Sequence, residues 1–341
     1  MKRIGSFWPQ VTTFENLLLA WHKAKKGKAK RDAVAKFSLN LEAELFALQQ
    51  ELNTLSYQPR PYTQFWINDR KPRLISAAHF RDRVVQHAIM NVIEMPMDKR
   101  LIHDCYACRT GKGTHKAVGR FREYQSRYTY VLRLDVKRYF PSVNHQILKN
   151  LLQKYIKDRS CLTVFDRIIN SSHLIQRNEI WEPVPVGTGI PIGNLTSQFF
   201  ANLYLNPMDQ FIKNKLNCPA YLRYMDDMAL FSDCKATLHQ WHEQLINELQ
   251  TLKLELHPKK QQLSQCREKQ DVFGYITTRD KTWVRNSNGY RYRQHLTKLV
   301  KRYHTGRLSW HDLNSSVQSW IGYSRYVDSV GLRKAIFSQL K

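Results

Sequence analysis

Apolar residues recur at helical spacing through much of this chain, and short apolar runs interrupt that period. The spacing predicts two helices joined by a basic loop within residues 11–55, and a helical tail over residues 285–341. Further helices are expected over residues 79–101, 116–126, 144–157, 163–171, about 199–216 and 236–252. Strands are expected over residues 57–75 and 128–136, on both sides of a turn at 226–227, and around 273–275. The pattern therefore predicts a chain that mixes helices with short strands.

Two adjacent carboxylates, Asp226 and Asp227, lie between two short apolar runs. This arrangement predicts two buried strands with the acidic pair at their tight turn. Two Asp side chains held there would repel each other, and a divalent cation would remove the conflict, because hard oxygen ligands suit magnesium. An isolated Asp-Asp pair is more often a solvated turn, so the rest of the sequence has to decide between the two interpretations.

A third carboxylate, Asp135, ends the apolar strand predicted over residues 128–136. A charged group at the end of a buried strand is costly unless something pairs with it. Asp135 is therefore the natural third oxygen ligand beside Asp226 and Asp227.

The charge of the chain indicates a polyanionic partner. Lys and Arg number 54 against 28 Asp and Glu, which gives a net charge of +26. Such a positive field most simply indicates nucleic acid, although a ribosome or an anionic membrane surface would also attract it. No apolar run reaches membrane-spanning length, no strongly amphipathic basic helix favours the membrane, and residues 1–10 lack the apolar core of a secretory signal. A cytoplasmic protein without a membrane partner is expected.

Several basic segments are candidates for nucleic-acid or nucleotide contacts. Lys71 and Arg73, on the second strand of the predicted hairpin, could hold a triphosphate, or could simply protect an exposed edge from aggregation. Arg109 and Lys112, in a glycine-punctuated loop over residues 106–115, are expected to contact template or primer phosphates; an ordinary glycine turn is equally compatible. The loop over residues 23–31 is either a solvated linker or a nucleic-acid arm.

The helical tail combines positive charge with aromatic rings. Residues 285–341 contain eleven Lys or Arg and two Asp, with tyrosines and tryptophans between them. Basic and aromatic residues together suit a surface that grips nucleic acid, whereas aromatics alone would suit the core of a small helical subdomain. Both interpretations are retained.

Taken in order, these motifs resemble the reverse transcriptase family over residues 57–341. The matching motifs are the strand with Lys71 and Arg73, the segment 135–140, the glycine turn at 189–197, Tyr-Met-Asp-Asp at 224–227, Pro-Lys-Lys at 258–260 and Phe-Gly-Tyr at 273–275. The resemblance implies an α+β, right-hand polymerase with an antiparallel palm sheet backed by helices and a helical, basic thumb. The expected domains are 1–127 (N-terminal helical extension and fingers), 128–278 (palm, with a fingers return segment near 176–192) and 279–341 (thumb).

The resemblance also assigns roles to the acidic residues. Asp135 and Asp226 would hold two magnesium ions, with the main-chain carbonyl of Val136 as a further ligand, and Asp227 would support the metal site at its edge. Lys259 or Lys260 would protonate the leaving pyrophosphate, and Lys260 is taken as the catalytic residue.

The nucleotide and the duplex would contact other matched residues. Lys71 and Arg73 would orient the triphosphate, Phe140 would be a steric gate against the sugar 2′-hydroxyl, and Ile192 and Gly193 would pack against the incoming nucleotide. Tyr224 and Tyr275, which belong to two of the matched motifs, are expected to contact nucleic acid. An aromatic gate at Phe140 implies a DNA product.

A finer resemblance is to the reverse transcriptases of diversity-generating retroelements. Most family members have Gln-Gly and Ser-Pro in the glycine turn, whereas this chain has Ile192-Gly193 and Ser197-Gln198. The resemblance implies error-prone copying of a template RNA from a DNA or RNA primer, with a small basic accessory protein. The alternatives are a bacterial defence-associated reverse transcriptase that copies a dedicated non-coding RNA, and a non-catalytic RNA-binding scaffold; retron enzymes and intron maturases are less favoured.

Overall fold

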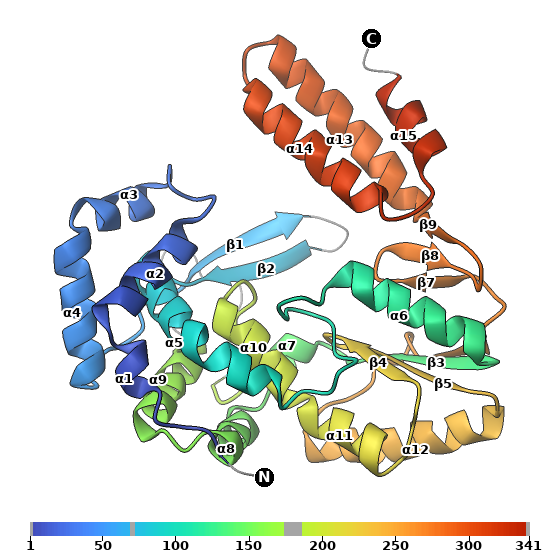
Figure 1. Cartoon of the computed structure of the whole chain (residues 1–341), viewed down its shortest axis with the longest axis horizontal. Coiled ribbons are helices and arrows are strands. Elements are labelled where there is room, and N and C mark those ends of the chain that lie inside the picture. Colours follow the sequence, from blue (N-terminus) through green and yellow to red (C-terminus); the bar gives the residue numbers. More distant parts are fainter. Residues whose placement is uncertain (1–2, 69–71, 174–185, 339–341) are drawn as a thin grey trace.

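In a computed structural model of the chain, residues 3–68, 72–173 and 186–338 are described. The N-terminal part packs short helices against a long one, and a two-stranded hairpin projects beside them (Figure 1). Its elements are α1 (Trp8–Val11), α2 (Phe14–Lys25), α3 (Asp32–Leu39), α4 (Leu41–Asn53), β1 (Thr63–Asn68), β2 (Pro72–Ala77) and α5 (Phe80–Asp98). The basic segment 23–31 covers the end of α2 and the connection to α3, and the region 11–55, which was expected to form two helices, contains three, α2, α3 and α4.

A four-stranded antiparallel sheet forms the centre of the molecule, with strand order β4-β5-β3-β6. Its strands are β3 (Tyr130–Asp135), β4 (Tyr221–Tyr224), β5 (Asp227–Ser232) and β6 (Gln262–Gln265). Helix α6 (Thr114–Arg127) covers one face and α12 (Lys235–Thr251) the other (Figure 1). Alternate residues of β3 enter different cores, since Val131 packs with Phe121 of α6 and Leu132 with the larger core.

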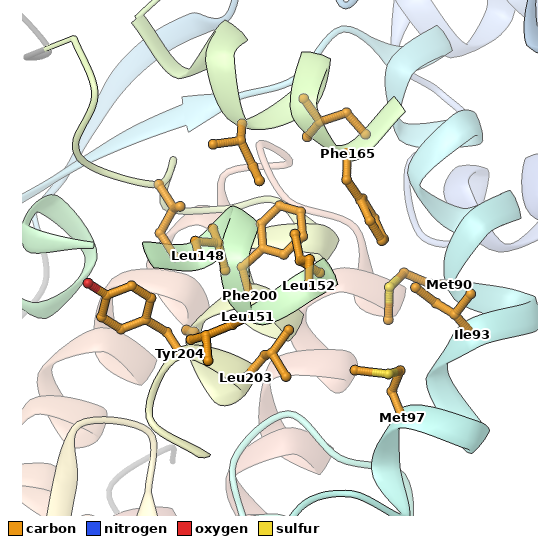
Figure 2. Close-up of a cluster of buried hydrophobic side chains, with 14 of the residues drawn as sticks. Met90, Ile93, Met97, Leu148, Leu151, Leu152, Phe165, Phe200, Leu203 and Tyr204 are labelled. Atoms are coloured by element: carbon orange, nitrogen blue, oxygen red, sulfur yellow. The ribbon is translucent and has the colours of Figure 1, made fainter. Parts of the chain in front are cut away.

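The larger core joins the helices on one side of the sheet. Helices α8 (His145–Tyr155), α9 (Arg159–Asn170) and α10 (Leu195–Tyr204) meet α5 there, and Figure 2 shows their apolar side chains interdigitating. Helix α8 contributes Leu148, Leu151 and Leu152, whose spacing places them on one helical face. This packing fixes the start of α10 against α5 and β2.

The C-terminal part has a smaller core, which it shares with Val118 of α6. A three-stranded sheet, β7 (Gln270–Val272), β8 (Tyr275–Thr277) and β9 (Thr282–Val284), leads into α13 (Asn286–His304), α14 (Trp310–Ser324) and α15 (Val330–Phe337). Tyr292 stacks on Trp320 with ring centroids 4.3 Å apart. Some of the tail aromatics are therefore core residues, and others, such as Trp310 and Tyr290, are exposed.

The prediction of a mixed α+β chain is confirmed, and one predicted helix differs. The long helix expected over residues 199–216 is two helices, α10 and α11 (Asn206–Asn214). Pro207 lies in the first turn of α11, where its missing N–H would break a continuous helix. Among the described residues, no helix has the length and apolarity that a membrane crossing requires.

Candidate active site

The antiparallel register of the central sheet brings three carboxylates to one end of it. Asp135, the last residue of β3, lies opposite Asp227, the first residue of β5. Asp226 occupies the turn between β4 and β5, and the N–H of Val136 donates to its main-chain carbonyl at 3.3 Å. Met225 adopts a left-handed conformation with φ of 58°. The fold thus places all three Asp residues at this end of the sheet, and their predicted role as metal ligands stays a prediction.

The three carboxylates disturb one another electrostatically. Burial and the charge of Asp135 raise the pKa of Asp226. Desolvation by surrounding protein atoms, with the charges of Asp226 and Asp135, raises the pKa of Asp227 to about 7. Asp227 nevertheless has the largest accessible surface of the three, so solvent reaches it most easily. The turn concentrates negative charge that a bound cation would neutralise.

Lys260 supplies one positive charge to this site. Its ammonium group donates to the carboxylate of Asp135, and 44% of the Lys260 side chain is exposed against 9% for Asp135. The preceding segment is tied down because the N–H of His257 donates to the main-chain carbonyl of Asp135 at 2.8 Å. Lys259 is also exposed, but no described hydrogen bond links its side chain to the carboxylates.

The donor set fits a hard divalent cation in its chemistry. Asp135 and Asp226 offer carboxylate oxygens, and Val136 follows Asp135 directly, as required if its carbonyl is a further ligand. Within the described ranges, no three His, Cys, Asp or Glu side chains are arranged closely enough to hold a metal ion by themselves. Oxygens from a substrate would therefore have to complete the coordination shell, as is usual for magnesium at phosphate-transferring sites.

A buried ion pair supports the acidic turn, and sequence reasoning missed it. Arg223 of β4 and Asp209 of α11 both have fully buried side chains, with the guanidinium 2.7 Å from the carboxylate. The same guanidinium donates to the main-chain carbonyl of Met225 at 2.9 Å. The available signal was an Arg inside an apolar strand, because such a charge is buried only with a partner.

A cleft of about 750 Å³ opens beside the hairpin. Arg73 of β2 and Ile192 line it, as do Lys137, Arg138 and Ser142 at the end of β3 and in α7 (Tyr139–Ser142). Phe140 is half-buried in α7, and its carbonyl accepts from the N–H of Ile190 at 3.0 Å. Arg73 and Ile192, two of the residues predicted to bind the nucleotide, therefore line the same cleft. Phe140 directly precedes Pro141, which also lines it. Lys71 lies outside the described residues.

Gly193 lies where the segment before α10 touches the hairpin. Its φ is 111°, and a Cβ added there would come within 2.8 Å of the Ile75 side chain. The N–H of Ser76 donates to the carbonyl of Ile192 at 3.1 Å, which ties the segment to β2. A residue other than glycine would therefore be strained as well as crowded.

The residues predicted to bind nucleic acid are placed differently from one another. Arg109 is paired with Asp98, with its Nε 2.5 Å from the carboxylate, and only 7% of its side chain is exposed. Tyr275 is fully buried in the small sheet, where its hydroxyl lies 2.9 Å from His115. Neither position supports a direct contact with nucleic acid, because internal partners already occupy these groups.

Lys112 and Tyr224 remain closer to the surface. Lys112 is half-buried and donates to the carbonyl of His103 at 2.9 Å. Tyr224 is half-buried as well, and its hydroxyl lies 2.9 Å from that of Thr114. Their predicted contacts with nucleic acid stay predictions.

Comparison with known proteins places this arrangement in context. A family model described as "Reverse transcriptase (RNA-dependent DNA polymerase)" matches residues 68–283, a range that includes all three carboxylates. The chain is 26% identical over 182 residues to "Protein YkfC" of Escherichia coli, covering 51% of this chain and 47% of that protein. It is 23% identical over 174 residues to "Group II intron-encoded protein LtrA" of Lactococcus lactis (50% of this chain, 28% of that one).

A third relative comes from yeast. The chain is 21% identical over 207 residues to "Putative COX1/OXI3 intron 2 protein" of Saccharomyces cerevisiae, which covers 58% of this chain and 24% of that protein. The chain therefore spans less than half the length of these curated relatives.

Proposed function

The chain belongs to the reverse transcriptase family, since the family model covers more than half of it, and we propose that it is an RNA-directed DNA polymerase. The observation that carries this proposal is the strand register that sets Asp135 opposite Asp227, with Asp226 in the adjoining turn. Three carboxylates at the end of a buried sheet, beside a basic cleft of about 750 Å³, suit a reaction of nucleoside triphosphates on a nucleic acid end.

We propose a right-hand arrangement with the predicted domains. Residues 1–127 would be the N-terminal extension and fingers, 128–278 the palm with the return segment near 176–192, and 279–341 the thumb. The smaller core cluster under α13, α14 and α15, which also includes Val118 of α6 and Tyr275 of β8, supports a thumb that packs on the rest of the molecule. Residues 174–185 of the return segment lie outside the described ranges. The boundary after residue 127 separates α6 from the sheet on which it packs, and the boundary after residue 278 separates β8 from its partner strand β9. Both proposed boundaries therefore lie within packed units.

In the proposed mechanism, Asp135, Asp226 and the carbonyl of Val136 would hold two magnesium ions, and Asp227 would support the site at its edge. When bound, the ions activate the primer 3′-hydroxyl and neutralise the leaving pyrophosphate. Lys260 leaves its ion pair with Asp135 and provides a proton to pyrophosphate. Its half-exposed position gives it the freedom for this exchange.

The nucleotide would lie in the cleft beside the hairpin. Arg73, with Lys71 from the same hairpin, would orient the triphosphate. Ile192 and Gly193 would pack against the nascent base pair, and Phe140 would exclude the 2′-hydroxyl. Template RNA and a DNA or RNA primer are the proposed nucleic acid partners, with Lys112 and Tyr224 as contact candidates.

Primer extension on an RNA template tests this proposal. We expect DNA synthesis that requires a divalent cation and falls by at least roughly 10³-fold in Asp226→Ala, since a metal site contributes several kcal/mol to such reactions. Glu268→Gln is the control, because Glu268 also carries a carboxylate and lies in the turn between β6 and β7. A protein that binds RNA equally well with and without Asp226 and never extends a primer would be the scaffold instead.

The finer proposal is error-prone copying at template adenines in a diversity-generating retroelement, with a small basic accessory protein. It rests on Ile192-Gly193 in the segment before α10 and on Ser197-Gln198 in the first turn of that helix. An apolar side chain at position 192 removes a hydrogen-bonding group beside the nascent pair, and polar contacts discriminate far better than apolar shape. The curated relatives named above include intron-encoded proteins, which do not support this subtype. The assignment therefore rests on the motif alone.

Sequencing of the complementary DNA made in the native genetic context distinguishes the alternatives. Substitutions mainly opposite template adenines, reduced by Ile192→Gln, are expected for a diversifying enzyme. Faithful or repetitive copies of one small RNA would move the assignment to defence. An error spectrum unchanged by Ile192→Gln would reject a role for this side chain.

A further inference from the structure

Phe140, the proposed steric gate, lies in α7, which is a helix of only four residues. So short a helix does not stabilise itself, because the entropy lost in forming its first turn exceeds what one turn of hydrogen bonds returns. Arg138, which precedes α7, adopts a left-handed conformation with φ of 48°. The position of Phe140 therefore depends on contacts from elsewhere in the chain.

Residues 187–190 provide such contacts through the main chain. Three hydrogen bonds of 3.0, 2.8 and 2.9 Å join this segment to α7 and the start of α8: from the N–H of Ile190 to the carbonyl of Phe140, from Gly189 to Val143 and from His145 to Gly187. Gly189 and Ile190 also line the cleft beside the hairpin. The segment is thus both a wall of the cleft and a support for the proposed gate.

The imidazole of His145 binds the middle of this segment. His145 is the first residue of α8, it is only 5% exposed, and its Nε2 lies 2.7 Å from the Gly189 carbonyl. Because a carbonyl oxygen only accepts, Nε2 carries the proton of this bond. Burial lowers the pKa of His145, so the donor at neutral pH is the uncharged tautomer with its proton on Nε2.

A single peptide group connects His145 with Phe140. The carbonyl of Gly189 and the N–H of Ile190 belong to one planar unit and point in opposite directions. His145 donates to this carbonyl, and this N–H donates to the Phe140 carbonyl. Rotation of the unit would break both bonds together. Gly189, with φ of 87°, offers little resistance to that rotation, because glycine adopts many backbone conformations.

We propose that His145 is a positioning residue for sugar selection: its imidazole fixes the peptide group between residues 189 and 190, and that group fixes the backbone of Phe140 beside the cleft. The inference rests on the proposed polymerase function, with Phe140 as the gate. His145 is not among the described residues that line the cleft. It therefore acts through Phe140 and not on the nucleotide directly.

Two substitutions that differ by one methylene group test the proposal. His145→Asn is too short to reach the Gly189 carbonyl, and should lower the ratio of kcat/KM for deoxynucleotides over ribonucleotides about fivefold, as expected for one ordinary hydrogen bond. His145→Gln can still donate from nearly the position of Nε2, and should keep the ratio within about twofold of wild type. An unchanged ratio in His145→Asn, or equal losses in both variants, would overturn the proposal.

Tyr155→Phe is the control for a general loss of stability. Tyr155 is the last residue of α8, and its buried hydroxyl accepts from the Asn206 amide at 3.0 Å. The variant removes a buried hydrogen bond from the same helix, far from Gly189, and should leave the ratio at the wild-type value. If Tyr155→Phe lowers the ratio as much as His145→Asn does, the effect is one of stability and the proposal is overturned.

A double variant shows whether His145 acts through the gate. In protein that already carries Phe140→Ala, adding His145→Asn should change the ratio by less than about twofold, because effects that pass through one residue are not additive. A further fivefold loss in this background would overturn the proposal, since His145 would then act on the sugar by another route.

Amide hydrogen exchange tests the positioning step without any assay of activity. In wild type, the N–H of Ile190 should exchange slowly, and His145→Asn should speed its exchange about fivefold, whereas Tyr155→Phe should not. Exchange of this amide at the rate of a free loop in wild type, or at equal rates in wild type and His145→Asn, would overturn the proposal.

Failure of this inference differs from failure of the proposed function. If Phe140→Ala lowers the ratio and His145→Asn does not, only the assignment of His145 falls. If Phe140→Ala leaves the ratio at the wild-type value, the gate falls, and the assignment of His145 with it. If wild-type protein never extends a primer, the polymerase assignment falls together with both.

Discussion

Arg223 and Asp209 form a fully buried ion pair that lies one hydrogen bond from the turn carrying Asp226 and Asp227. The pair is shared by three elements, because Asn202 of α10 also accepts from the guanidinium at 3.2 Å. The Tyr221 hydroxyl donates to Asp209 at 2.7 Å. The acidic turn is thus anchored to the helices behind the sheet.

Removing one partner of this pair should strongly destabilise the protein. Arg223→Met leaves the Asp209 carboxylate buried and uncompensated, and we expect the free energy of unfolding to fall by about 3–5 kcal/mol. Chemical denaturation measures the change. Arg127→Gln breaks an exposed pair with Glu123 and should cost less than about 1 kcal/mol. Similar losses of unfolding free energy in the two variants would show that the buried pair stabilises the fold no more than the exposed pair does.

Gly193→Ala should strain the segment before α10, where Gly193 touches the hairpin. Its φ of 111° and the Ile75 contact at 2.8 Å predict a loss of about 1–2 kcal/mol in the free energy of unfolding, together with a raised KM for the nucleotide. Gly322→Ala is the control, since Gly322 lies inside α14 with open space around it and should gain about 0.5–1 kcal/mol. An unchanged KM in Gly193→Ala would argue against the proposed place of the base pair.

Phe140→Ala should admit ribonucleotides. Truncation leaves the backbone of α7 in place, because that backbone is held through the hydrogen bond between Ile190 and the Phe140 carbonyl. We expect the ratio of kcat/KM for deoxynucleotides over ribonucleotides to fall by at least about tenfold. For Phe140→Leu, which retains more bulk, this ratio should lie between those of the wild type and Phe140→Ala. Continued exclusion of ribonucleotides by the Ala variant would count against the gate.

His87 should make folding sensitive to acid. Its folded-state pKa of about 4 lies below the ordinary value of 6.5, so the unfolded chain binds more protons between these values. Stability should therefore decrease as the pH falls through this window, by on the order of 1 kcal/mol after screening of a half-exposed group. Denaturation at several pH values should show this slope in wild type and a smaller slope in His87→Gln. Equal slopes would contradict the assignment of the effect to His87.

The sequence by itself determined the acidic site. Asp135, Asp226 and Asp227 could be found from local patterns, because a carboxylate at the end of a buried apolar run is conspicuous whatever the surrounding fold. The hairpin with Arg73 and the helical tail followed from periodicity in the same way. The break between α10 and α11 was missed, although Pro207 marked it, because the apolar stripe continues across that break.

Only the tertiary structure decided which charged residues face solvent and which face one another. Arg109 looks like an ordinary basic residue in the sequence, and Arg223 is marked only as a charge inside an apolar strand. The fold pairs them with Asp98 and Asp209, which lie 11 and 14 residues away on other elements. Conversely, Lys28 and Gln86 acquire a common pocket only because α2, α5 and the start of α10 pack together. Such partnerships depend on long-range packing, which local residue patterns do not encode.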